Sequence, residues 1–345
     1  MLIFSNGRVV LKELERRRSF SHRNLQKLVS AENIATDLID GKACVYATGS
    51  FGRGEASDGS DLDLFIVGRS ESSDGGDKSP PQRLLKRLDE VCLKADLIRA
   101  TEKLGLPEFD GDGEYLKHHS IIELVETLGK PTDDSSNTFT ARMLLLLESA
   151  PIFEEDVYSE AVDQVIEKYW RDWDDHKSNF SPSFLLNDIL RLWRTFCVNY
   201  EARTSSFPAP KKIKRRIKNY KLKQSRMLTC YSAVLGLLAT VRMKGTVSQV
   251  DFKDLVMRSP TKRLEWIADL DLSAECTTKV RTLLDKYVRF LERTNLPSEA
   301  LQKKFSDDAS RSELMTEAED FSQTMYDAIM EVGETDGRLL RYVVA

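Results

Sequence analysis

The chain has 345 residues, of which 41% are hydrophobic and 31% charged, and its formal net charge is -4. This length suggests about two domains with packed cores, and the slightly acidic balance excludes a general polyanion-binding protein. No run approaches about 18 consecutive apolar residues, so the sequence predicts no membrane-spanning helix. The five cysteines lack paired spacing, which predicts free thiols. Because the N-terminal apolar run is too short for a signal peptide, we expect a cytoplasmic protein.

Two helices and a strand are predicted before the first glycine-rich segment. The helices are predicted over 9–19 and 22–39 from the spacing of apolar residues, and the strand over 43–48. The glycine-rich loop follows, from residue 48 to residue 60. Glycines let the backbone approach an anion closely, and a helix that begins there directs its N–H groups toward phosphate.

A second strand is predicted over 61–67, and it begins with two acids, Asp61 and Asp63. Residues i and i+2 of a strand point the same way, so the two carboxylates should lie close together. Two like charges held that close need a cation between them, and hard oxygen ligands select Mg2+ or Mn2+. The loop and the acids together predict chemistry on a nucleoside triphosphate.

The next segments are predicted to complete a small mixed sheet. The polar stretch 68–81 predicts a mobile surface loop. A helix is predicted over 82–96, followed by a short strand near 114–118. The apolar face of that helix should consist of Leu84, Leu85, Leu88, Val91 and Cys92.

From residue 120 onward the pattern is helical. The segment 138–149 is apolar on nearly all sides, which predicts a core helix. Other helices are predicted over 154–175, 183–202, 224–242, 274–294 and 311–331. We therefore expect an α+β fold, in which a small mixed sheet with flanking helices is followed by an all-α bundle. The expected domains are 1–130 and 131–345.

Two polar features of the helical half are candidates for function. Asn187, Arg191 and Arg194 share one helix face and could contact a nucleotide, or they could form a structural network with Asp188. In the run 211–226, nine of sixteen residues are basic. That run could bind nucleic acid, with Tyr220 stacking on a base, or an acidic protein, or it could be a solvated loop.

The loop and the acids resemble the signature of the polymerase-β-type nucleotidyltransferase superfamily. The resemblance rests on Gly49-Ser50, on Gly52-Arg53-Gly54-Glu55 and on Ser60-Asp61-Leu62-Asp63. The Gly-Arg-Gly-Glu run is most similar to the catalytic domain of PII-protein uridylyltransferases and related nucleotidyltransferases. The similarity covers roughly the first 150 residues.

The resemblance implies roles for the loop residues. Asp61 and Asp63 would hold two catalytic metal ions, and Gly49 and Ser50 would contact the β- and γ-phosphates. Arg53 would either lock the loop or face phosphate. Glu55 is expected to be a structural anchor that pairs with Arg53.

The superfamily also has a third acid on a later strand. Asp112 is the first candidate, because His119-Ser120 can be set against a similar pair in the uridylyltransferases. Asp110 and Glu114 remain alternatives.

By resemblance, the helical domain closes the nucleotide cleft and contributes residues to the phosphates. The candidates are Arg191, Lys221, Lys223, Ser225 and Arg226. The proximal residues 211–218 would then be a solvated basic surface. No His-Asp dipeptide occurs, so the phosphohydrolase domain that follows in the bacterial uridylyltransferases is not expected.

The implied activity is a metal-dependent nucleotidyltransferase of the EC 2.7.7 type. It would move a nucleoside monophosphate from an NTP to a protein, an RNA such as tRNA, or a small molecule, and release pyrophosphate. Two alternatives stay open: a catalytically silent sensor that binds nucleotide or RNA, and a template-free RNA-tailing enzyme. The base, the acceptor and the oligomeric state do not follow from the sequence.

Overall fold

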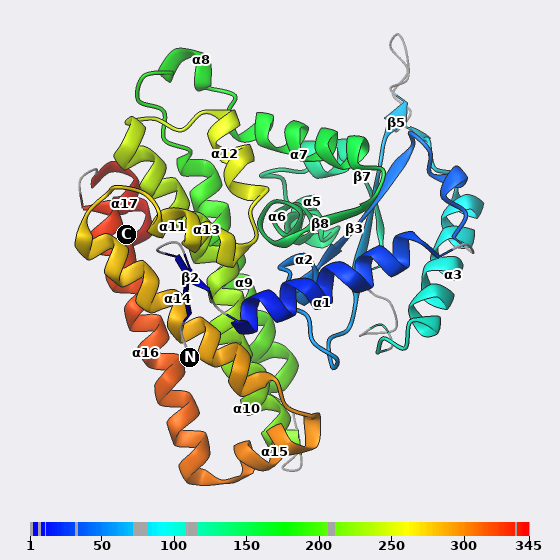
Figure 1. Cartoon of the computed structure of the whole chain (residues 1–345). Coiled ribbons are helices and arrows are strands. Elements are labelled where there is room, and N and C mark those ends of the chain that lie inside the picture. Colours follow the sequence, from blue (N-terminus) through cyan, green and yellow to red (C-terminus); the bar gives the residue numbers. More distant parts are fainter. Residues whose placement is uncertain are drawn as a thin grey trace. The chain divides into compact units, whose positions relative to one another are not determined.

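The computed structural model describes most of the chain as two compact units (Figure 1). The described residues are 3–5, 8–10, 12–31, 34–71, 82–107, 109, 116–205, 211–334 and 337–344, with backbone alone for 3–5, 8–10 and 344. One unit comprises residues 15–168 and contains a four-stranded sheet. The other comprises residues 1–14 and 169–345 and is mainly helical. The expected α+β fold followed by a helical bundle is therefore confirmed.

The sheet of the first unit is mixed, with the order β7-β4-β3-β8. β3 pairs antiparallel with β4 and β8, and β4 pairs in parallel with β7. The four strands are β3 (Ala43–Thr48), β4 (Asp63–Gly68), β7 (His118–Ser120) and β8 (Ala150–Phe153). The strand expected over 43–48 is confirmed, whereas β4 begins two residues later than expected and β7 lies nearer the C-terminus than 114–118.

The helices of this unit cover both faces of the sheet. On one face, Val45 and Ile66 pack with Leu28 of α1 and Leu93 of α3 in a single apolar core. On the other face, the Tyr46 ring contacts Tyr158 of α7, with ring centroids 5.9 Å apart. The helical segments are α1 (Lys12–Val29), η1 (Thr36–Leu38), α2 (Gly49–Gly52), α3 (Arg87–Lys103), α4 (Ile121–Glu126), α5 (Thr132–Ser135), α6 (Thr138–Glu148) and α7 (Glu155–Tyr169).

Two short strand pairs lie outside this sheet. β1 (Ile3–Ser5) pairs with β2 (Arg8–Val10), where a helix was predicted from residue 9. β5 (Ser70–Glu71) pairs with β6 (Gln82–Arg83), so both ends of the expected 68–81 loop are held together. Residues 72–81 of that loop lie outside the described residues. One continuous helix, α1, replaces the two helices predicted over 9–39.

The expectation that the chain is helical from residue 120 onward was wrong at β8. This strand lies at the edge of the sheet and contains Pro151, opposite Tyr46. Proline has no N–H to donate to a ladder, but an edge strand tolerates it. The pairing also shifts register between Val45 and Tyr46. Because β8 belongs to the sheet, the compact unit extends past residue 130, and a functional boundary at 130 stays a prediction.

The predicted apolar face of the helix after the loop was also wrong. α3 begins at Arg87, so Leu84 and Leu85 precede it. Leu88 is 77% exposed and Val91 is 55% exposed. Cys92 is exposed as well. The buried side of α3 consists of Leu93, Leu97, Ala100 and Thr101, one turn further along the chain.

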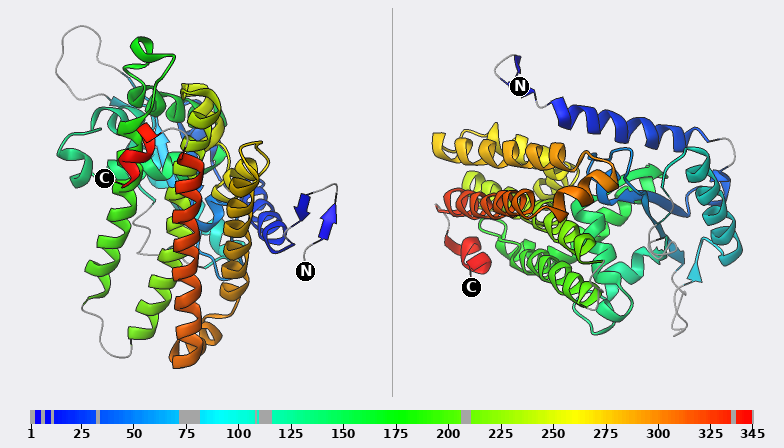
Figure 2. Two further views of the ribbon diagram at one scale, coloured as in Figure 1. Left: turned by 90° about the vertical axis from the view of Figure 1, so that its left-hand side faces the viewer. Right: turned by 90° about the horizontal axis from the view of Figure 1, so that it is seen from below.

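The second unit is built on long helices that lie side by side (Figure 2). Helix α16 contacts both α11 and α14, and α11 also contacts α9. The helices are α8 (Trp173–His176), α9 (Ser183–Thr204), α10 (Lys212–Lys221), the π-helix η4 (Leu222–Arg226), α11 (Met227–Lys244), α12 (Gln249–Val256), α13 (Pro260–Ala268), α14 (Ala274–Thr294), α15 (Ser298–Ser306), α16 (Asp308–Gly333) and α17 (Gly337–Val344).

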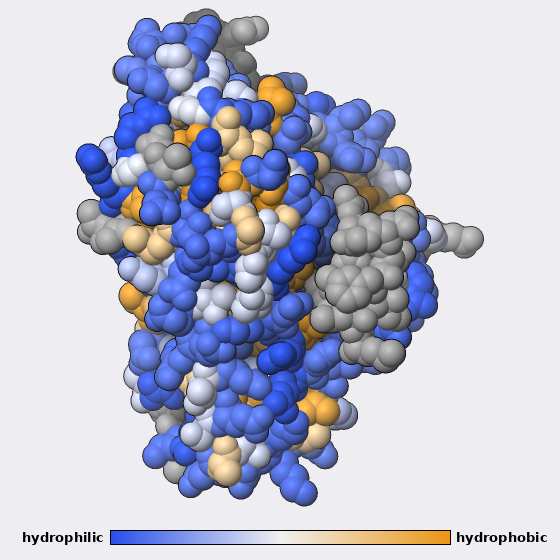
Figure 3. All heavy atoms as spheres, turned by 60° about the vertical axis from the view of Figure 1, so that its left-hand side comes forward, coloured by the Kyte–Doolittle hydropathy of each residue, from blue (hydrophilic) through white to orange (hydrophobic). Residues whose placement is uncertain are grey.

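Hydrophilic side chains predominate on the face of the molecule drawn in Figure 3, where apolar side chains form small groups. Among the helices that the structure describes, none combines the length and apolar character needed to cross a bilayer.

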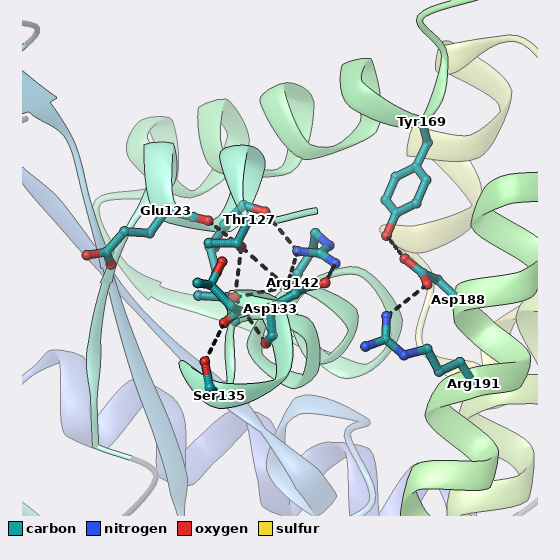
Figure 4. A network of polar contacts seen from close by, with 11 residues as sticks. Glu123, Thr127, Asp133, Ser135, Arg142, Tyr169, Asp188 and Arg191 are labelled. Atoms are coloured by element: carbon teal, nitrogen blue, oxygen red, sulfur yellow. Dashed lines mark hydrogen bonds and ion pairs between the residues drawn. The ribbon is translucent and has the colours of Figure 1, made fainter. Parts of the chain in front are cut away.

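The core helix predicted over 138–149 is confirmed as α6, and it carries a buried arginine in its middle. Arg142 and Asp133 are both fully buried, and Nη2 of Arg142 lies 2.6 Å from Oδ2 of Asp133 (Figure 4). Arg142 also donates to the carbonyl of Leu124 at 2.9 Å, and Thr138 donates to Asp133. This network joins α4, α5 and α6, because Leu124 belongs to α4, Asp133 to α5, and Thr138 and Arg142 to α6.

We predict that Asp133→Asn destabilises the sheet unit by about 3–5 kcal/mol, because it leaves the Arg142 charge buried without its carboxylate. Amide hydrogen exchange in α6 measures the effect. The matched substitution Asp174→Asn removes a carboxylate that is 86% exposed in an ion pair with Lys177, and it should change exchange little. Equal protection of α6 in Asp133→Asn and wild type would contradict the prediction.

The same unit contains a buried histidine, His119, in β7. His119 is 2% exposed and its ring stacks on Phe65. Its Nε2 has no hydrogen-bond partner among the described residues. Burial lowers the pKa of His119 from 6.5 to about 4, and Lys117 acts in the same direction. Burial also lowers the pKa of His118, against the opposing hydrogen bond with Glu90.

We predict that the protein loses stability as the pH falls from about 6.5 to about 4, since the unfolded chain then binds a proton that the folded chain excludes. His119 alone should cost about 2 kcal/mol between pH 7 and pH 5. Urea unfolding followed by circular dichroism at the two pH values measures this loss. It should shrink in His119→Gln and persist in the control His22→Gln, which alters an exposed histidine.

Candidate active site

The glycine loop connects two paired strands of the sheet. Thr48, the last residue of β3, lies opposite Asp63, the first residue of β4. The short helix α2 begins directly after Thr48, so the register of two strands places the loop beside the second acid.

Gly49 and Asp63 are in direct contact. Gly49 has a positive φ of 63°, and a Cβ at this position would lie 2.6 Å from Oδ2 of Asp63. No carbon atom fits at that distance, so the Asp63 carboxylate lies where a side chain at residue 49 would be. The structure therefore brings together the first glycine of the loop and one of the two predicted metal ligands.

The two acids differ from the buried residues around them. Leu62, between them, is 1% exposed, whereas Asp61 and Asp63 are both half-buried. Leu64 is fully buried, so burial alternates along this segment with the period of an extended chain. Asp61 precedes β4 and lies in the loop, although a strand was predicted from residue 61.

The turn before Asp61 is held by its own hydrogen bonds. Ser60 N donates to the carbonyl of Ser57 at 2.8 Å, and Ser57 N donates to Oγ of Ser60 at 3.0 Å. Ala56 N donates to Oγ of Ser21 in α1 at 3.0 Å, which ties the loop to that helix. Asp61 therefore follows a chain segment that is fixed at both ends.

The carboxylate oxygens of Asp61 and Asp63 are of the type that binds a small hard cation. Magnesium is usually held by one or two carboxylates, with substrate phosphates and water completing its shell. Asp61 and Asp63 supply two such carboxylates. Among the described residues, no group of three or more acidic, histidine or cysteine side chains is arranged to hold a metal ion. The candidates for the third acid, Asp110, Asp112 and Glu114, lie outside the described residues.

Arg53 is committed to a buried ionic network. Its Nε donates to Oε2 of Glu55 at 2.8 Å, and its Nη1 donates to Oε2 of Glu148 at 2.7 Å. Arg53 is 6% exposed and the two glutamates are 2% exposed each. The predicted pairing of Glu55 with Arg53 is confirmed. The geometry supports Arg53 as the lock of the loop, and its contact with phosphate stays a prediction.

Sequence reasoning missed Glu148, which joins this network from the end of α6. A single acid at the end of the apolar run Met143–Leu147 was the available signal, because a buried acid needs a cationic partner. Gly52 lies against the same helix end: a Cβ there would lie 2.1 Å from the Glu148 carbonyl oxygen and 2.7 Å from that of Ala47. The loop is thus packed between β3 and α6 without room for a side chain.

Ser50 is half-buried, and its carbonyl accepts a hydrogen bond from Glu55 N at 2.8 Å. This bond closes the loop back on itself. Arg17 of α1 adds a second clamp, because its Nη1 donates to the carbonyl of Glu55 at 2.8 Å. The loop is therefore held by its own backbone, by α1 and by α6.

The polar stripe on α9 is part of a network within the helical unit. Asp188 accepts a hydrogen bond of 2.6 Å from the Tyr169 hydroxyl, and Nη1 of Arg191 lies 3.5 Å from its other oxygen (Figure 4). Asn187 and Arg194 are exposed. These contacts support the structural alternative for Arg191, and a role in nucleotide binding stays a prediction.

The distal basic residues lie on a helix and not in a solvated loop, so that alternative was wrong. Lys223, Ser225 and Arg226 belong to the π-helix η4, and Lys221 ends α10. Oγ of Ser225 donates to the carbonyl of Lys221 at 2.9 Å. The Arg226 guanidinium lies 5.0 Å from the centre of the Phe196 ring, and Nζ of Lys223 lies 3.9 Å from Glu319. Their contact with a nucleotide stays a prediction.

The unit that contains the sheet, residues 15–168, includes the segment that is similar to a known protein family. Neither a curated protein nor a solved structure was found to match the chain. The family model of the nucleotidyltransferase domain matches residues 31–139, which include the glycine loop, both acids and β7. Residues 31–139, about a third of the chain, are therefore similar to a nucleotidyltransferase domain.

Proposed function

We propose that the protein is a metal-dependent nucleotidyltransferase that moves a nucleoside monophosphate from an NTP to an acceptor and releases pyrophosphate. The observation that carries the proposal is the contact between the Asp63 carboxylate and Gly49, because it joins one of the two predicted metal ligands to the predicted phosphate loop. The family match over residues 31–139 supports nucleotidyl transfer as the general reaction.

In this proposal Asp61 and Asp63 bind Mg2+ or Mn2+, and Gly49 and Ser50 contact the β- and γ-phosphates. When bound, the ions would activate the acceptor nucleophile and stabilise the leaving pyrophosphate. The residues of the chain hold the reactants in place: the Arg53 network fixes the loop, and the Ser57–Ser60 turn fixes the approach to Asp61.

The remaining assignments come from the resemblance. Asp112 serves as the third acid, with Asp110 and Glu114 as alternatives. The helical domain contributes Arg191, Lys221, Lys223, Ser225 and Arg226 to the nucleotide. The relationship to PII-protein uridylyltransferases is part of the proposal, and so is the choice of a protein, RNA or small-molecule acceptor.

We predict that Asp61→Asn combined with Asp63→Asn lowers nucleotidyl transfer by at least about a hundredfold. Removing a residue that merely supports a metal ligand already costs 10- to 100-fold, so removing two ligands should cost more. The measurement is release of labelled pyrophosphate from each NTP with Mg2+ or Mn2+ and cell extract as the source of acceptor. Chelation of the metal by EDTA should have the same effect.

The matched control is Asp58→Asn, which makes the same change at an exposed position of the same loop. It should leave transfer unchanged. If the double variant and wild type release pyrophosphate at equal rates, the enzyme assignment fails. Stabilisation by nucleotide without any release in wild type would instead identify a silent sensor, because a ligand at a hundredfold its Kd adds about 2.7 kcal/mol of stability.

We predict that Gly49→Ala abolishes most of the transfer while the protein stays folded. The new Cβ would displace the Asp63 carboxylate, and the positive φ would cost about 1 kcal/mol in addition. Pyrophosphate release measures the activity, and thermal unfolding measures the stability.

The control variant Gly245→Ala separates the effect of backbone strain from the effect of displacing the Asp63 carboxylate. Gly245 has a φ of 73°, and apart from its chain neighbours no described atom lies within 4 Å of the place that a Cβ would take, so only the backbone strain remains. This variant should lose a similar amount of stability and retain full transfer. Equal activities of Gly49→Ala and Gly245→Ala would show that the contact with Asp63 does not matter for the reaction.

A further inference from the structure

Helix α10 concentrates positive charge in an acidic protein. Six of its ten residues are basic and none is acidic, whereas the chain has a net charge of -4. Like charges on neighbouring turns of one helix repel each other. The helix must therefore be held in place by its apolar side.

That side is anchored by Tyr220. The Tyr220 ring is fully buried, and its centroid lies 5.4 Å from that of Phe290 and 5.6 Å from that of Phe305. Ile217 lies one turn earlier and Ile213 two turns earlier on the same helix face, and both are half-buried. Because this stripe faces the protein, the cationic side chains face outward, and the exposed ones are Lys212, Lys214, Lys218 and Lys221.

A cavity of about 400 Å³ lies beside α10, within the helical unit. Four cationic side chains line it, from α10 and from the first turn of α16: Lys212, Arg215, Arg216 and Arg311. Tyr200 and Asn219 also line it. The volume lies within the range of sites that bind small ligands or a single base.

The aromatic ring in this cavity is held by an arginine. The Arg215 guanidinium lies 5.8 Å from the centre of the Tyr200 ring, and its Nε donates to the Tyr200 hydroxyl at 3.2 Å. Nη2 of Arg215 also pairs with Glu201 at 2.9 Å. Tyr200 and Arg215 therefore present planar groups in a fixed arrangement.

The side chains that line the cavity carry a net positive charge, even when the carboxylates paired with them are included. Glu201 pairs with Arg215, and Asp308 pairs with Arg311. Within the described ranges, Lys212 and Arg216 form no ion pair. Two cations at the cavity are thus available to an anionic ligand.

We propose that the surface formed by α10 and this cavity binds single-stranded nucleic acid. The cations extend along a helix of ten residues, or about 15 Å, which exceeds the reach of one phosphate group and suits a strand with several. An unpaired base can enter the cavity, stack on the planar groups of Tyr200 and Arg215, and bond to the Asn219 amide. A duplex hides its base faces, and an acidic peptide has none.

This inference goes beyond nucleotidyl transfer, because strand binding does not require Asp61 or Asp63. Only the further idea that the bound strand is the acceptor rests on the proposed function. A binding measurement without NTP therefore tests the surface separately from the reaction.

The test is fluorescence anisotropy of the whole protein with labelled oligouridylate and with labelled oligothymidylate, between about 50 and about 200 mM salt. Wild type should bind a single strand with an affinity that falls steeply with salt, and a difference between the two probes would show whether the strand is RNA or DNA. In Lys212→Gln/Arg216→Gln, affinity should fall about tenfold or more. The slope of log K against log salt should fall by about 1.4, since each single-strand phosphate contact contributes about 0.7.

The control Arg171→Gln/Lys177→Gln removes two exposed cations elsewhere in the same unit and should bind as wild type does. Tyr200→Leu should weaken binding without changing the salt slope, whereas Tyr200→Phe keeps the ring and should bind normally. The proposal is overturned if Lys212→Gln/Arg216→Gln keeps the wild-type affinity and slope. It is equally overturned if a duplex of the same length or polyglutamate binds as tightly as the single strands.

Discussion

The candidate site depends on two places where the backbone of the glycine loop approaches other groups more closely than any side chain would allow. On one side, the Asp63 carboxylate occupies the position of a Cβ at Gly49. On the other side, the carbonyl of Glu148 occupies that of Gly52. Both contacts require glycine for lack of space, and at Gly49 the positive φ requires it as well. The loop is thereby fixed between the second acid and the end of α6.

Charge balance explains why the loop can be packed so deeply. Glu55 and Glu148 are buried, and buried carboxylates are costly unless a cation and hydrogen bonds accompany them. Arg53 supplies two such bonds and is itself buried in doing so. A side chain engaged in this way stabilises the loop. Ser50 and the two aspartates stay half-buried, as do the turn residues Ser57 and Ser60.

The local parts of this site could be predicted from the sequence, because they depend on residues near one another in the chain. The strand 43–48, the loop, the two acids and the pairing of Arg53 with Glu55 all fall within some twenty residues. Glu148 could not be predicted as their partner, since it is almost a hundred residues away and its neighbours suggest only a core helix. The third acid stays a prediction.

Errors elsewhere in the fold have a similar cause. A proline usually ends a helix or a strand. A strand is possible around Pro151 only because β8 lies at the edge of the sheet. The apolar residues that predicted the buried face of α3 came from two different segments. Leu84 and Leu85 precede the helix, whereas Leu88 and Val91 lie in its first turns. The buried face was therefore assigned one turn too early. In both cases tertiary packing decided what local spacing left ambiguous.

The proline and the register shift in β8 also affect whether a strand of another molecule can pair with the edge of this sheet. A strand at a sheet margin offers unpaired backbone groups to which a foreign strand can add, and this is a common start of aggregation. In β8 the missing N–H of Pro151 and the irregular ladder interrupt that row of groups. The opposite margin, β7, is only three residues long. Along the strands that the structure describes, neither margin gives a neighbouring molecule a continuous template, so these strands should not add a foreign strand even when the protein is concentrated.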